Sequence, residues 1–213
     1  MKDAPIDTIL TKEEQAALPP DAVLAILKEG NARFVEGDVT HRDHREQVRL
    51  AAAGQFPKAF ILSCVDSRIP VEDVFDRGIG DIFVGRIAGN FVNVDLLGSM
   101  EFACKVSGSK LMVVLGHESC GAIKGAIDRV ELGNLTALLQ SLQPAVDAVQ
   151  GVDGPRSSKN DALVHHVAEE NVRLNVAAIR DKSPILRAME EAGELRIVGA
   201  MYAMETGKVT FFE

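Results

Sequence analysis

The chain has 213 residues, of which 46% are hydrophobic and 25% charged, and its formal net charge is −8 at pH 7. This length allows one hydrophobic core of good size, and the negative charge argues against nucleic-acid partners and anionic membrane surfaces. The three cysteines are too few for a disulfide framework. Neither a secretory leader nor a bilayer-spanning apolar run is visible, so we expect a protein of the cytoplasm.

Residues 1–54 predict a helical arm. Pro19-Pro20 ends a polar stretch, and Asp21 is expected to cap the helix that follows. The apolar face of this helix comprises Val23, Ile26, Leu27 and Phe34. A second helix is expected from about residue 43 to 53. Because both helices precede the first core strand, they pack either on this chain's own core or on a second copy of the chain.

From residue 55 onward, predicted strands alternate with predicted helices. The strands are expected at about residues 58–63, 81–84, 111–115, 195–200 and 208–212. The main helices are expected at about residues 70–76, 94–106, 135–149 with a bend at Pro144, 161–180 and 184–192. This alternation indicates an α/β fold: a mostly parallel four-stranded sheet with an added edge strand and helices on both faces. We treat residues 1–213 as a single domain, with residues 1–54 as the arm and residues 55–213 as the core.

Three potential metal ligands follow two of the buried strands. Cys64 comes directly after the first strand, and His117 and Cys120 come at the end of the third. Because the carboxyl ends of parallel strands meet in one crevice, we expect the three side chains to lie together. Two thiols and an imidazole are typical of zinc, and three protein ligands leave a fourth position open for catalysis. At the start of a helix, Cys120 is expected to have a lowered thiol pKa.

Asp66 and Arg68 flank the first of these ligands. The Asp66 carboxylate could be a fourth ligand, or it could orient a metal-bound hydroxide while Arg68 holds it in a forked contact. A plain surface ion pair is the simpler interpretation, but it fits poorly with a position directly after a buried strand. Cys104 falls within an apolar helical pattern, so we expect it to pack in the core.

These motifs resemble those of the β-class carbonic anhydrases. The family pattern Cys-x-Asp-Ser-Arg stands at residues 64–68, its pattern His-x-x-Cys-Gly stands at residues 117–121, and the similarity extends from about residue 31 to 212. The resemblance implies that Cys64, His117 and Cys120 bind one zinc ion per chain. It also implies that Asp66 is either the fourth ligand of a closed form or the partner of zinc-bound hydroxide in an open form, in which Arg68 holds it.

The resemblance further implies the activity of a carbonate dehydratase, which is a lyase. This activity is the reversible hydration of carbon dioxide to bicarbonate and a proton. Gln55, which in this family can come from the neighbouring subunit, and Gly121 would contact the substrate. The chain would form a homodimer or a tetramer, with the N-terminal helices extending toward the partner. Two alternatives stay open: hydrolysis of carbonyl sulfide or carbon disulfide, and a zinc module without turnover, whose site would keep four ligands at every pH.

Overall fold

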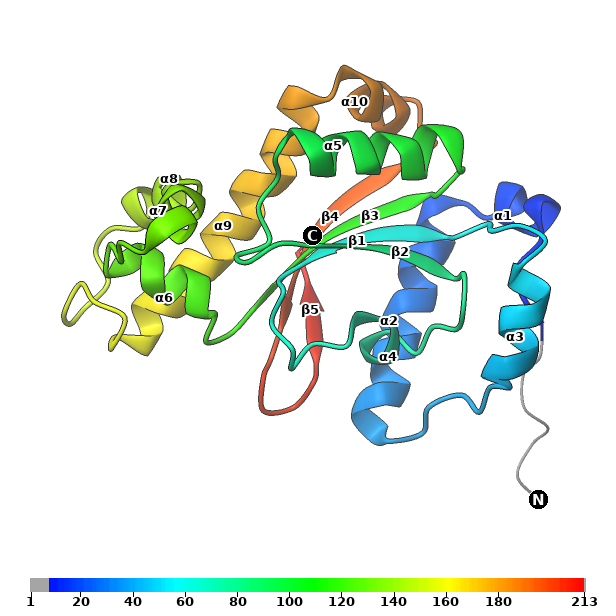
Figure 1. Ribbon diagram of the computed structural model, residues 1–213, viewed down its shortest axis with the longest axis horizontal. Helices are drawn as coiled ribbons and strands as arrows, with labels where there is room; N and C mark the ends of the chain where they lie inside the picture. The colour runs from blue at the N-terminus through cyan, green and yellow to red at the C-terminus, as the bar shows by residue number, and fades with distance from the viewer. Residues whose placement is uncertain (1–7, 213) are drawn as a thin grey trace.

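The computed structural model describes residues 8–212. Within them, five strands form one sheet in the order β2-β1-β3-β4-β5 (Figure 1). The strands are β1 (Ala59–Ser63), β2 (Ile82–Arg86), β3 (Leu111–His117), β4 (Arg196–Tyr202) and β5 (Val209–Phe211). The first four are parallel, whereas β5 runs antiparallel to β4. The predicted fold class, a mostly parallel sheet with an added edge strand, is therefore confirmed.

Helices cover both faces of this sheet (Figure 1). One face is covered by α2 (Pro20–Glu36) and α4 (Val71–Val74). The other face is covered by α5 (Val94–Glu101), the π-helical turn η1 (Phe102–Val106), α9 (Asp161–Lys182) and α10 (Pro184–Glu191). Helices α6 (Gly121–Ile127), α7 (Gly133–Gln140) and α8 (Gln143–Ala148) pack together at one end of α9, beyond the end of the sheet (Figure 1). Two further helices, α1 (Lys12–Ala17) and α3 (His44–Ala51), lie beside the end of the sheet where β1 begins. Among residues 8–212 we find no helix with the length and apolar character needed to traverse a lipid bilayer.

The core forms two apolar layers because successive side chains of a strand point to opposite faces. In β1, Phe60 and Leu62 join the layer under α9, whereas Ala59 and Ile61 join the layer under α2. Helix α9 lies close to the sheet because two strand positions are glycines. A Cβ atom at Gly116 would lie 2.5 Å from one methyl group of Val172, and a Cβ atom at Gly199 would lie 2.6 Å from the other.

Helix α2 packs on the chain's own sheet. Its residues Val23, Leu24 and Leu27 are buried in one apolar cluster with β1 and β3. The prediction that Asp21 caps this helix was wrong, because the helix begins one residue earlier, at Pro20, with Pro19 in the cap position. Asp21 lies in the first turn instead and forms an exposed ion pair with Arg196 (2.6 Å).

Candidate metal centre

The three predicted ligands lie where the strand order reverses. From β1 the chain passes to β2 on one side of β1 and later returns to β3 on the other side. Ser63 is in register with Leu115, so Cys64, one residue after β1, comes level with the last residues of β3, which ends at His117. Loops that leave neighbouring parallel strands in opposite directions open a crevice between them.

The structure brings these ligands together. One ligand atom each from Cys64, His117 and Cys120 lies within 4.8 Å of the others, and no other such group occurs among residues 8–212. The side chains come from the loop after β1, the end of β3 and the residue before α6. They are 4%, 1% and 1% exposed, so the cluster lies beneath the surface.

The imidazole of His117 has the tautomer that a metal ligand requires. Its Nδ1 lies 2.9 Å from the backbone oxygen of Glu118, and since a carbonyl only accepts, Nδ1 carries the proton. The lone pair therefore belongs to Nε2, which is buried and has no hydrogen-bond partner. A buried polar atom without a partner costs about 1–3 kcal/mol, and a metal ion between the two sulfurs and Nε2 would satisfy it. This donor set fits zinc.

The two thiols affect each other's ionisation. The hydrogen bond from Cys120 lowers the pKa of Cys64 well below its usual range, and the Gly89 N–H acts in the same direction. The same bond to Cys64 raises the pKa of Cys120, and burial adds to the rise. The predicted lowering of the Cys120 pKa was therefore wrong, because the adjacent Cys64 thiolate outweighs the helix start. Binding of a metal cation requires both thiols to be deprotonated.

Asp66 is held by Arg68 and stands outside the cluster. Arg68 donates from Nε to Oδ1 (2.9 Å) and from Nη2 to Oδ2 (2.7 Å), and its backbone N–H also donates to Oδ1 (3.0 Å). The side-chain bonds from Arg68 lower the pKa of Asp66 to about 2. Of the two predicted arrangements, the structure has the one in which Arg68 holds an ionised Asp66.

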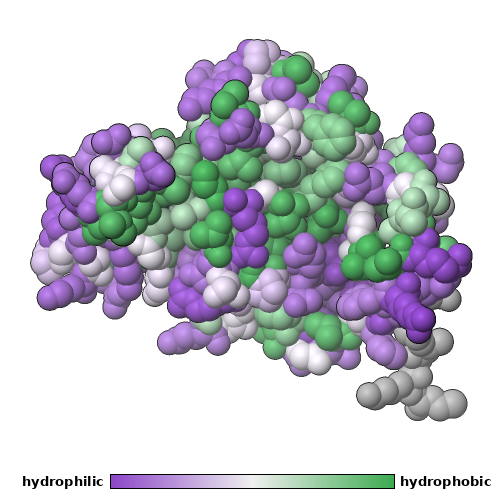
Figure 2. All heavy atoms as spheres, in the orientation of Figure 1, coloured by the Kyte–Doolittle hydropathy of each residue, from purple (hydrophilic) through white to green (hydrophobic). Residues whose placement is uncertain are grey.

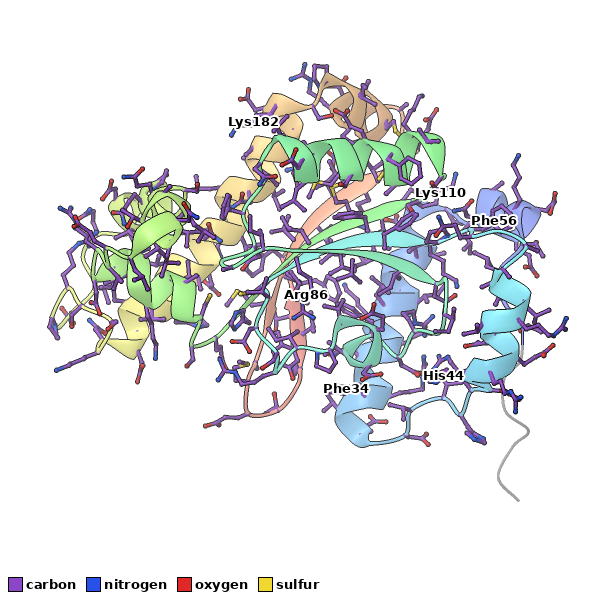
Figure 3. The ribbon with its side chains drawn as sticks, viewed as in Figure 1. Phe34, His44, Phe56, Arg86, Lys110 and Lys182 are labelled. Carbon is purple, nitrogen blue, oxygen red and sulfur yellow. The ribbon has the colours of Figure 1, made fainter. Side chains whose placement is uncertain are left out.

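The loop after β2 supports the cluster, a role that the sequence alone did not assign. Arg86, at the end of β2 (Figure 3), donates to the backbone oxygens of Cys64 (2.8 Å) and Asp66 (2.6 Å). The backbone N–H of Gly89 donates to Cys64 Sγ (3.3 Å). The available signals for this role were an arginine at the end of β2 and a glycine in the loop that follows it, because β2 neighbours the strand that leads to Cys64.

Of the two predicted substrate residues, Gly121 lies beside the cluster, whereas Gln55 lies far from it. Gly121 is the first residue of α6, next to Cys120, and is exposed. Gln55 is exposed and precedes β1, whereas Cys64 follows it. The strand between them spans about 16 Å, and Figure 3 labels Phe56 and Arg86 at opposite ends of the sheet. Cys104 is buried in the core outside the cluster, as expected, and burial raises its pKa to about 12.

Comparison with known proteins gives one consistent family. The family model described as carbonic anhydrase matches residues 59–209. Carbonic anhydrase 2 of Mycobacterium tuberculosis is 36% identical over 200 residues, which cover 89% of this chain and 91% of the relative. The carbonic anhydrase of Mycolicibacterium smegmatis is 34% identical over 196 residues, which cover 89% of this chain and 92% of the relative.

Solved structures show the same fold. The β-carbonic anhydrase CafA of Aspergillus fumigatus is 29% identical and superposes with a TM-score of 0.68 over 91% of this chain and 90% of that one. A Coccomyxa β-carbonic anhydrase in complex with acetazolamide is 26% identical, with a TM-score of 0.68 over 76% of this chain and 74% of the other.

Proposed function

The chain belongs to the β-carbonic anhydrase family, and from this premise we propose that Cys64, His117 and Cys120 hold one zinc ion per chain. The protein is a carbonic anhydrase, a lyase that hydrates carbon dioxide reversibly to bicarbonate and a proton. The observation that carries the metal assignment is the buried Cys-His-Cys cluster with the unpartnered Nε2 of His117. Three protein donors leave a fourth position for a small reactant, as catalytic zinc sites require.

The residues around the cluster then have distinct tasks. A bound zinc ion supplies a Lewis acid that makes water a better nucleophile near neutral pH. Cys64 and Cys120 would bind the metal as thiolates, and the Glu118 carbonyl keeps Nε2 of His117 directed at the metal position.

Asp66 orients the attacking water. Its Oδ1 accepts from both the side chain and the backbone N–H of Arg68, whereas Oδ2 accepts one bond, from Arg68 Nη2, and keeps a lone pair for a second donor. An ionised carboxylate beside the reaction centre accepts a hydrogen bond from the reacting water at Oδ2, which leaves an oxygen lone pair of the water directed at carbon dioxide. Arg68 holds the carboxylate in this position and keeps it charged.

The proposal also includes a homodimer or a larger assembly of dimers. Gln55 lies at the far end of β1 from its own cluster, so Gln55 of the partner subunit is the copy that could contact the substrate beside Gly121. One chain with residues 1–54 as an arm and residues 55–213 as the core would form each subunit. The three cysteines are free thiols, which supports a location in a reducing compartment such as the cytoplasm.

Metal content and turnover test this function together. The purified protein is expected to contain one zinc per chain and to hydrate carbon dioxide in a stopped-flow assay, with activity lost on chelation and restored by zinc. Cys120→Ser should lose both metal and activity, whereas the control Cys104→Ala, which changes a buried cysteine outside the cluster, should keep both. A protein that binds no zinc would overturn the proposal. Faster turnover of carbonyl sulfide or carbon disulfide would favour a sulfur-compound hydrolase, and zinc without turnover would indicate a non-catalytic module.

A further inference from the structure

The loop between β2 and α5 presents a backbone donor to one proposed ligand. Gly89 in this loop has φ +81°, and a Cβ atom there would stand 2.7 Å from the Leu142 side chain. Both the left-handed backbone and the close approach of Leu142 require glycine. The Gly89 N–H points at Cys64 Sγ over 3.3 Å. The conformation of this loop therefore decides whether the Cys64 sulfur accepts a hydrogen bond.

A buried asparagine holds the loop from the other side. Asn171 of α9 is 2% exposed, and its Nδ2 donates to the backbone oxygen of Gly89 (2.8 Å). The metal-ligand sulfur binds the N–H of Gly89, and Asn171 binds its carbonyl. Because the two contacts lie on adjacent peptide groups, fixing the carbonyl restricts the rotation that would turn the N–H away from sulfur.

A second asparagine fixes the first. Asn175 lies four residues later on the same face of α9, and its Nδ2 donates to the backbone oxygen (2.7 Å) and Oδ1 (3.0 Å) of Asn171. Its Oδ1 accepts from the Val92 N–H (2.7 Å). The backbone partners determine both amide orientations, because the Gly89 carbonyl only accepts and the Val92 N–H only donates.

We propose that Asn171 is a positioning residue of the metal centre, which acts through Gly89 on the Cys64 sulfur. This inference rests on the proposed function, because it takes Cys64 as a metal ligand. A sulfur that accepts an N–H bond gives less electron density to its metal, and a fixed loop keeps the ligand in place before the metal arrives. Loss of Asn171 therefore changes both the metal–sulfur bond and the metal affinity.

A purely structural role for Asn171 makes a different prediction, and a matched control separates the two. Asn31 of α2 is also buried, with 4% exposed, and it forms hydrogen bonds with the backbone at Val74, Gly207 and Val209. Asn31→Leu removes a comparable buried network that holds other segments. If Asn171 only satisfied backbone groups, both Asn171→Leu and Asn31→Leu would lower the melting temperature, and neither would change the metal centre.

The test uses the cobalt-substituted and zinc-loaded full chain. In Asn171→Leu we expect the sulfur-to-cobalt charge-transfer band to move to longer wavelength and zinc affinity to fall about tenfold or more in competition with a chromophoric chelator. Asn31→Leu should keep the wild-type band and affinity. A folded Asn171→Leu protein whose band and affinity equal those of Asn31→Leu would overturn the proposal.

A measurement on the wild-type chain tests the hydrogen bond from the Gly89 N–H to Cys64 Sγ even if the variant does not fold. In the wild-type chain loaded with ¹¹³Cd, NMR should show a scalar coupling between cadmium and the Gly89 amide proton across the sulfur. A missing coupling would refute the inference while leaving the metal assignment intact. A wild-type chain that binds none of cobalt, zinc or cadmium would instead refute the proposed function, and the inference with it.

Discussion

The contacts of Asp66 keep its carboxylate charged and fix its orientation. It is bonded by both side-chain donors and by the backbone N–H of Arg68, and its side chain is 14% exposed, whereas that of Arg68 is 56% exposed. An exposed ion pair of this kind contributes little to stability. The arrangement is therefore better explained by what the carboxylate does at the cluster than by folding.

At the residue scale we predict that Asp66→Asn keeps zinc and loses most of its activity. The amide has nearly the same size, but it is uncharged and presents an NH2 donor in place of one acceptor oxygen, so it orients the reacting water poorly and kcat for carbon dioxide hydration should fall about 100-fold or more. Zinc content and stopped-flow hydration measure the two effects separately. Asp21→Asn, which removes an acid from the exposed pair with Arg196, should leave both unchanged. Unaltered turnover in Asp66→Asn would remove the role given to this side chain.

The ligands were predictable from the sequence, whereas their supporting residues were not. Cys64, His117 and Cys120 each follow a short apolar run that reads as a buried strand, so their meeting point follows from sheet topology. Asn171 and Asn175 sit in a helix among buried positions such as Val172. Their role depends on the path of a loop some 80 residues earlier, and no local pattern encodes that pairing.

At the scale of secondary-structure elements, one acid joins α2, α4 and the segment before α3. Asp76, in a left-handed conformation (φ +48°), is 1% exposed. It accepts from Arg33 Nε (2.6 Å), Arg42 Nη1 (2.5 Å) and Thr40 Oγ1 (2.6 Å). Burial raises the pKa of Asp76, but the bonds from Arg42, Thr40 and Arg33 outweigh it and lower the pKa to about 2.

This lowered pKa predicts how stability depends on pH. Since the pKa of Asp76 is about 2 in the folded chain and 3.8 for the ordinary group, its contribution is complete above about pH 5 and is lost as pH falls through both values. That contribution is about 2 kcal/mol. In urea unfolding, the difference in unfolding free energy between wild type and Asp76→Asn should therefore be constant from pH 7 to 5 and shrink below pH 4. A difference independent of pH down to 3 would contradict this account.

Element boundaries show which signals the sequence carries well. The apolar runs predicted all five strands to within two residues. The signal is clearest for the central parallel strands β1 and β3, which are apolar on both faces. The polar helix α1 was missed, although Thr11 and Glu14 form a capping box that marks its start. The bent helix expected at 135–149 is two helices, with Pro144 in the first turn of α8. The helix expected at 94–106 ends in the π-helical turn η1, which no sequence pattern indicated.

At the scale of the whole molecule, the edge of the sheet formed by β2 is open in a single chain. Strand β2 pairs only with β1, and its apolar residues remain partly exposed. The ring of Phe83 in β2 packs against Phe102 of η1, with centroids 6.1 Å apart, and Phe102 is 48% exposed. Apolar side chains gather on this face of the molecule around β2 and α5 (Figure 2). A parallel sheet is normally covered, so this surface is where we place the second copy of the chain.

This placement predicts a dimer that depends on Phe102. The wild type is expected to sediment as a dimer or tetramer at micromolar concentration, and Phe102→Glu should shift it toward the monomer, because the substitution puts a charge into an apolar contact. Leu132→Glu alters a residue that is 67% exposed beside α7, away from β2, and should leave sedimentation unchanged. A wild-type monomer at all concentrations, or a Phe102→Glu dimer of unaltered strength, would show that the surface has another use.

The burial of Cys64, His117 and Cys120, each at most 4% exposed, also bears on how long an ion would stay. An ion enclosed on this scale escapes only when the surrounding loops open, so its residence time follows the frequency of local unfolding rather than equilibrium affinity alone. A strong scavenger in the surrounding solution would then strip the centre slowly. Loading would be fastest while the nascent chain is still open, which ties acquisition of the ion to the moment of folding.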